Sequence, residues 1–235
     1  MDEAANKTGQ LHKELDYHRI EGSFGGNQEW FLGPWMKGGG CGAETAIESC
    51  IHFARHFGRT ELYPFDARNL TRADYRKFGT IMRPYLSPRW TGIDRLDIFV
   101  DGFGKYLGDR GAAGIRMEKL EAAEAGFDRA REAVIGRIDR NIPLPMLVLN
   151  HKDKRFEEYV WHWIILCGYE EADRAPEPGP GEDAGCAASR WKAPDGETRF
   201  YVKTATYSEW NWIDFEALWD SGEERKGGLI LYSLD

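Results

Sequence analysis

The chain has 235 residues, enough for one domain with a sizeable core. Its hydrophobic content of 42%, with nine tryptophans, excludes an intrinsically disordered chain. The formal net charge of −8 argues against nucleic acid as the main partner, because phosphate contacts need a basic surface. No apolar run has the length of a membrane span, and residues 1–17 lack the apolar core of a signal peptide, so we expect a cytoplasmic location.

The first half of the sequence is predicted to be helical. The first helix carries apolar side chains at helical spacing and stops at Gly58, and the second opens on the capping-box-like Thr71-Arg-Ala-Asp74. The third opens on Thr91-Gly-Ile-Asp94. The four predicted helices cover residues 41–57, 71–82, 91–111 and 127–140.

The second half is predicted to form strands, because its apolar runs are rich in β-branched and aromatic residues. A short helix with Asp214 as its N-cap is expected before the last strand. Residues 171–197 are rich in Pro, Gly, Ala and Asp, which predicts an exposed insertion between two strands. The predicted strands cover residues 146–150, 159–168, 199–204 and 228–232.

Helices followed by an antiparallel sheet predict an α+β fold. We expect an N-terminal tail at residues 1–20 and a single domain over residues 21–235. The alternating Trp210 and Trp212 are expected to pack against the first helix.

Four cysteines are present, and none is paired in a CxxC spacing, which argues against a zinc knuckle or a redox dithiol. Cys50 and Cys167 lie in apolar segments and are predicted to be core residues, whereas Cys186 lies in the predicted insertion.

Cys41 stands apart, because it lies between glycines at the start of a predicted helix. Unpaired N–H groups and the positive end of the helix dipole favour a thiolate at this position. Glycine has no Cβ, so we expect a substrate to reach the sulfur closely past Gly40 and Gly42.

His162 lies on a predicted strand, on the same face as Ile164 and Leu166. Taken alone, a strand histidine is more often a core residue that bonds a backbone carbonyl. The combination with a cysteine at a helix start, more than a hundred residues earlier, favours a pair of nucleophile and base.

With these motifs the chain resembles the papain-like cysteine peptidases, and in particular their C39-like branch. The matching segments are Gly40-Cys41-Gly42, the helix that leads into Asn141-Ile-Pro143, and His162-Trp163 through Gly168-Tyr169; Asn141 stands where the family has glycine. The resemblance implies a papain-like fold and hydrolysis of a peptide or protein substrate without cofactor or metal. It also implies Cys41 as nucleophile and His162 as general base, held as a thiolate–imidazolium pair.

The family also uses a glutamine upstream of the cysteine, whose amide helps to bind the oxyanion. The usual spacing falls on Trp35, and the nearest amides are those of Asn27 and Gln28. Gln28 is predicted to take this role, with a turn residue in Gly-Gly-Asn-Gln as the rival interpretation.

The third family residue orients the histidine from the next strand, and the expected position falls on Thr204. No acid is present there, so the resemblance implies a dyad or an incomplete triad. Thr206, Asn211 and Asp214 are the alternatives, although Asp214 is better explained as an N-cap.

Two other functions have some support in the sequence. The missing acid favours a non-catalytic domain that binds a peptide or protein partner in the same groove. His52 and His56 are spaced to share a metal, but no third ligand is evident, and a partly exposed helix face explains them better. His151 follows a predicted strand in what reads as a turn. Substrate specificity and oligomeric state are not predicted.

Overall fold

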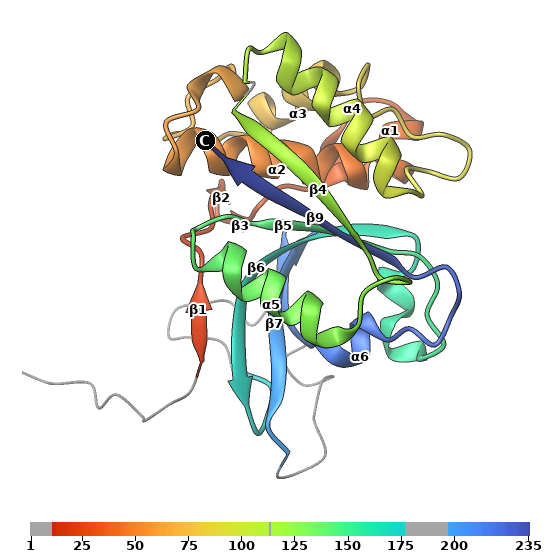
Figure 1. Ribbon diagram of the computed structural model, residues 1–235. Helices are drawn as coiled ribbons and strands as arrows, with labels where there is room; N and C mark the ends of the chain where they lie inside the picture. Colours follow the sequence, from red (N-terminus) through yellow and green to blue (C-terminus); the bar gives the residue numbers. More distant parts are fainter. Residues whose placement is uncertain (1–10, 113, 177–196) are drawn as a thin grey trace, which may run out of the picture.

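The computed structural model describes residues 11–112, 114–176 and 197–235. Its centre is an antiparallel sheet of seven strands in the order β4-β9-β5-β6-β7-β8, with β1 also paired to β6 (Figure 1). A small hairpin, β2 (Arg19–Ile20) and β3 (Ser23–Phe24), forms a second sheet of two strands. The strands of the main sheet are β1 (His12–Glu14), β4 (Ile115–Glu121), β5 (Leu144–Val148), β6 (His162–Ala172), β7 (Arg199–Thr206), β8 (Glu209–Asp214) and β9 (Gly227–Leu234).

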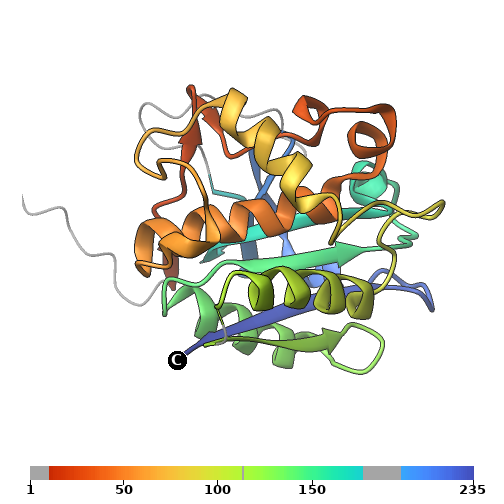
Figure 2. The ribbon, with the colours of Figure 1, turned by 90° about the horizontal axis from the view of Figure 1, so that it is seen from above.

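The helices cover both faces of this sheet, which confirms the α+β class. Figures 1 and 2 show the first four helices on one side and α5 on the other. Short 3-10 helices occupy Gln28–Trp30, Thr60–Leu62 and Lys154–Tyr159. The α-helices are α1 (Pro34–Gly39), α2 (Cys41–His56), α3 (Arg72–Met82), α4 (Leu96–Asp109), α5 (Phe127–Ile138) and α6 (Phe215–Trp219).

Two helices begin at the capping residues predicted from the sequence. Thr71 accepts a hydrogen bond from the N–H of Asp74 at the start of α3, and Asp214 accepts one from Ala217 at the start of α6. The third predicted helix starts later, at Leu96, because residues 91–94 form a loop.

The sequence patterns missed α1 and the strands β1, β2, β3, β4 and β8. β4 is mostly polar, since it pairs only with β9 at the edge of the sheet. In β8, Trp210 and Trp212 are buried in the core that contains β6 and β7, so the prediction that they pack against the first helix was wrong.

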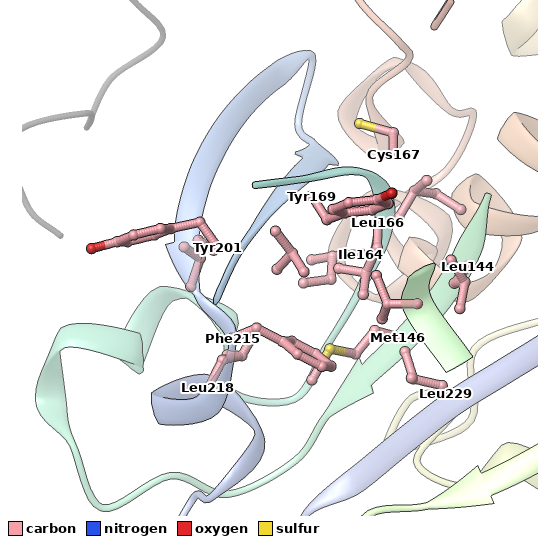
Figure 3. Close-up of a cluster of buried hydrophobic side chains, with 14 of the residues drawn as sticks. Leu144, Met146, Ile164, Leu166, Cys167, Tyr169, Tyr201, Phe215, Leu218 and Leu229 are labelled. Carbon is pink, nitrogen blue, oxygen red and sulfur yellow. The ribbon is translucent and has the colours of Figure 1, made fainter. Parts of the chain in front are cut away.

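The sheet separates two hydrophobic cores, because alternate side chains of β5 point to opposite faces. Met146 and Val148 join the core with α5 and α6, part of which Figure 3 shows. Leu147 and Leu149 join the core formed by α2, α3 and α4.

Two predicted boundaries need correction. The domain starts before residue 21, because Glu14 pairs with Gly168 and the side chains of Leu15, Tyr17 and Ile20 are buried. The predicted insertion at 171–197 begins within β6, which continues to Ala172, and its residues 177–196, with Cys186, lie outside the described residues. Among the described helices, none combines the length and the apolar character that a membrane span requires.

His52 is completely buried rather than partly exposed, and its Nε2 donates to the carbonyl of Asn141 at 2.7 Å. Burial lowers the pKa of His52 to about 3. The unfolded chain therefore takes up this proton first as the pH falls below about 6.5, which destabilises the fold.

We expect His52→Gln, which keeps a donor, to reduce this acid sensitivity. Between pH 7 and pH 5, wild type should lose about 2 kcal/mol of unfolding free energy relative to the variant. Urea denaturation at both pH values measures the difference. An identical pH dependence in the two proteins would contradict the burial of a neutral imidazole.

Candidate functional site

The first residue of α2 is Cys41, which follows directly on α1 through the N-cap Gly40. A Cβ on Gly40 would lie 2.2 Å from the carbonyl oxygen of Met36, and one on Gly42 would lie 2.9 Å from Ile93. The glycines thus permit close packing around the helix start. We expected these glycines to leave space for a substrate, but protein atoms of Met36 and Ile93 occupy the space beside them.

His162 is the first residue of β6, and its strand pairs with β5 at Val148. The preceding residue, Trp161, has a φ of 58°, a left-handed conformation that is costly for a bulky side chain. The N–H of Trp161 donates to the carbonyl of Leu149, which holds this turn against β5. The strained turn at Trp161 therefore determines where β6 begins and positions His162 as its first residue.

The structure brings Cys41 and His162 together. The backbone N–H of Trp163, the residue next to His162, donates to the sulfur of Cys41. Both side chains line one cavity of about 810 Å³, which Gln28 also lines. Three residues predicted from the sequence thus meet at one place.

Two residues of the β7–β8 hairpin hold the imidazole. Nε2 of His162 lies 2.6 Å from Oγ1 of Thr206, which leaves Nδ1 as the nitrogen that can accept a proton. The ring of Tyr207 stacks on the imidazole with centroids 4.6 Å apart and planes at 3°. Thr206 therefore fixes the orientation of the imidazole at the edge of the ring, and Tyr207 fixes it at the face of the ring.

Thr204, the predicted orienting residue, does not contact His162. It is fully buried, pairs with Leu166, and donates its hydroxyl to the carbonyl of Asn211. Leu166 lies four residues along β6 from His162, about 13 Å at the rise of a strand. Thr206 points to the same face two residues nearer the hairpin tip, which is why it reaches the ring.

The other two alternatives also lie elsewhere. Asn211 donates its side-chain amide to the hydroxyl of Tyr159, and Asp214 caps α6 and lies 3.3 Å from a guanidinium nitrogen of Arg199. The described residues therefore place a hydroxyl, not a carboxylate, on the imidazole.

The position of Gln28 is compatible with both rival interpretations, and its role in binding an oxyanion stays a prediction. It starts the 3-10 helix Gln28–Trp30, which Asn27 caps by accepting from Glu29. Its side chain is buried, lines the cavity, and donates one amide hydrogen to the carbonyl of Lys37 at 2.9 Å. The second amide hydrogen is left for an oxygen in the cavity.

The pKa values of Cys41 and His162 do not favour the thiolate–imidazolium pair that the sequence predicted. Burial raises the pKa of Cys41 to about 11, although the N–H groups of Trp163, Gly42 and Cys41 itself act to lower it. Burial also lowers the pKa of His162 to about 4. At neutral pH the resting pair is thus a neutral thiol and a neutral imidazole, because desolvation outweighs the helix start.

Exposed aromatic side chains form the rim of the cavity. Trp90 is 88% exposed and its ring lies 6.1 Å from that of Trp35. Trp161 is also exposed at the opening. The loop that carries Trp90 is tied to the sheet by the indole of Trp163, which donates to the carbonyl of Ile93 at 2.6 Å. The cavity therefore has an apolar, open entrance suited to a large ligand.

The remaining histidine candidates do not form a site. Nε2 of His52 and Nε2 of His56 donate to the backbone carbonyls of Asn141 and Asp16, and His151 bonds Ala217 in its turn. In the described part of the chain, no cluster of three or more His, Cys, Asp or Glu side chains could hold a metal ion.

Sequence reasoning missed Tyr207 and the backbone donor at Trp163. Tyr207 and Ser208 form the tip of the β7–β8 hairpin with left-handed φ angles of 51° and 65°. Such turns are normally marked by Asn-Gly, so the Tyr-Ser pair carried no recognisable signal.

Comparison with known proteins found no family model, no curated protein and no solved structure that matches this chain.

Proposed function

We propose that the protein is a cysteine-dependent hydrolase, a peptidase or amidase of papain-like fold, that acts by acyl transfer. The observation that carries this proposal is the meeting of Cys41, His162 and the amide of Gln28 in one cavity, with a backbone N–H aimed at the sulfur. A peptide or protein substrate suits the open aromatic entrance. The cytoplasmic location stays a prediction.

Acylation begins when Nδ1 of His162 takes the thiol proton and the sulfur of Cys41 attacks the amide carbonyl carbon. The oxyanion is held by the N–H of Cys41 and the free amide hydrogen of Gln28. The C–N bond then breaks as His162 returns the proton to the leaving amine. In the second half, His162 takes a proton from water as the oxygen attacks the thioester carbon. The C–S bond then breaks, and His162 returns the proton to the sulfur, which restores the thiol and the neutral imidazole.

Because the thiol of Cys41 and the imidazole of His162 are both neutral at rest, the bound substrate must favour proton transfer from the thiol to the imidazole. The transferred proton places imidazolium and thiolate next to one another, and the three N–H groups near the sulfur stabilise its negative charge. Thr206 accepts from Nε2–H and so orients the ring, but it has no charge to balance the imidazolium. We therefore expect a slow enzyme with strict demands on substrate fit.

A second candidate is a binding domain that uses the same cavity without chemistry. The raised pKa of Cys41 and the hydroxyl in place of an acid favour this alternative. The two candidates differ in whether a bound peptide amide is cleaved.

A library of peptides that end in a vinyl sulfone distinguishes them, because only a catalytic thiol reacts quickly with a well-placed electrophile. We expect mass spectrometry to find the adduct on Cys41, with Cys50 and Cys167 unmodified and no adduct in Cys41→Ala. Binding of intact peptides, with neither adduct formation nor cleavage, would identify a binding domain instead.

A further inference from the structure

Glu44 is a buried acid directly behind the nucleophile. It lies on α2 one turn after Cys41, and only 4% of the residue is exposed. A carboxyl group in such a place is costly unless hydrogen-bond donors surround it. The groups that donate hydrogen bonds to Glu44 therefore indicate its role.

Two backbone N–H groups point to Glu44. That of Gln28 lies 2.9 Å from Oε2, and a backbone hydrogen bond from Tyr207 acts to lower the pKa of the carboxyl group. Gln28 supplies the amide in the cavity, and Tyr207 supplies the ring stacked on His162. One side chain thus holds the two segments that flank the pair.

Glu48, one turn further along α2, strengthens the same connection. Its carboxylate accepts from the N–H of Gly26 at 3.0 Å and from the hydroxyl of Tyr17 at 2.7 Å, and Nε2 of His18 lies 2.9 Å away. The N–H of Ser208 in turn donates to the carbonyl of Gly26 at 2.7 Å. The loop before Gln28 and the hairpin tip are thereby tied to one another and to α2.

The hairpin tip needs such support. Tyr207 and Ser208 both adopt left-handed φ angles, which cost free energy for residues other than glycine. An acceptor for the N–H of Tyr207 is expected to favour this strained turn over more relaxed conformations. The stacking on His162 depends on the strained one.

The two acids differ in charge. Burial and the neighbouring Glu48 raise the pKa of Glu44, which favours its neutral form. For Glu48, burial acts to raise the pKa, but the contact with His18 and the hydrogen bonds outweigh it and lower the pKa. The two carboxyl groups can therefore lie on adjacent turns without strong repulsion, and the carbonyl oxygen of a neutral Glu44 remains an acceptor.

We infer that Glu44 is a positioning residue that holds the backbone of Gln28 and of Tyr207 in register with Cys41. Its effect on catalysis rests on the proposed function. Since Cys41 and Glu44 lie on the same helix, α2, the amide of Gln28 and the imidazole stacked on Tyr207 are both positioned relative to the sulfur by that helix.

Glu44→Met tests this inference, because methionine keeps the length of the side chain and removes both acceptor oxygens. We expect the amide hydrogens of Gln28 and Tyr207 to exchange at least about tenfold faster, and those of Gly26 and Ser208 to stay protected. The kcat for a cleaved peptide should fall about tenfold or more, with KM within about twofold, because a small misplacement affects mainly the transition state. Glu44→Gln keeps one oxygen and should restore slow exchange and most of kcat.

Ser49→Ala is the matched control, since it removes a buried α2 hydrogen bond, from the hydroxyl of Tyr232, without touching the site. It should leave both amides and kcat unchanged. Should Glu44→Met fail to fold, Glu44→Asp, whose carboxyl is one methylene shorter, should show the same faster exchange.

Unchanged exchange in the variants, or faster exchange with unchanged kcat, would overturn the inference. A wild-type protein without Cys41-dependent cleavage would defeat the proposed function alone, while hydrogen exchange would still decide whether Glu44 holds the two amides.

Discussion

His162→Ala is expected to lower kcat/KM for amide hydrolysis by about three orders of magnitude, within the range that a general base contributes. The imidazole shares the cavity with Cys41 and is the group proposed to take the thiol proton. Steady-state kinetics with a peptide identified by the vinyl sulfone library measures the loss. KM should change little, because His162 acts on the thiol rather than on the bound peptide.

The same histidine sets the pH profile. His162 must be neutral to accept a proton, and its pKa is lowered to about 4 by burial. We therefore expect kcat/KM to rise as the pH increases through about 4 and to be flat around neutrality, where thiol and imidazole are both neutral. An acid limb near pH 6.5, the ordinary value for histidine, would show that the imidazole is solvated in the working enzyme.

His151→Ala provides the matched control. This histidine lies in a turn, where it bonds Ala217 and the N–H of Asp153, away from the cavity lining. Its loss should leave kcat/KM and the pH profile unchanged. Equal losses in both variants would point to destabilisation of the fold rather than to a catalytic base.

Thr206→Val is expected to lower kcat by about tenfold to a hundredfold. Valine has a similar shape but removes the oxygen 2.6 Å from Nε2 of His162, so the ring loses the contact that selects its tautomer and its rotation. The stack with Tyr207 still limits the tilt of the ring, which keeps the loss below that of removing the imidazole. Stopped-flow measurement of acylation isolates the affected step.

Thr204→Val is its matched partner, from the same strand and the same face. It should leave kcat unchanged and cost about 1 kcal/mol of unfolding free energy, because the hydroxyl bonds the carbonyl of Asn211 within the sheet. The reverse pattern, with kcat lost in Thr204→Val and retained in Thr206→Val, would contradict the pairing of Thr204 with Leu166.

Local sequence determined much of this protein. Apolar residues at helical spacing predicted α2, and the capping residue Thr71 predicted α3. The predicted start of α2 placed Cys41 in the first turn of that helix. The hydrophobic runs predicted β5, β6, β7 and β9, and so put His162 on a strand. These features depend on hydrogen bonds and side-chain periodicity within one segment, which is why the sequence alone reveals them.

Tertiary structure decided the rest. The choice of Thr206 over Thr204 depends on how far β7 is shifted along β6, where the pairing changes register between Leu166 and Gly168. The neutral thiol of Cys41 depends on how much protein covers it, and burial outweighs the helix start. Strand register and desolvation both arise from contacts between segments far apart in the chain, so no local pattern contains them.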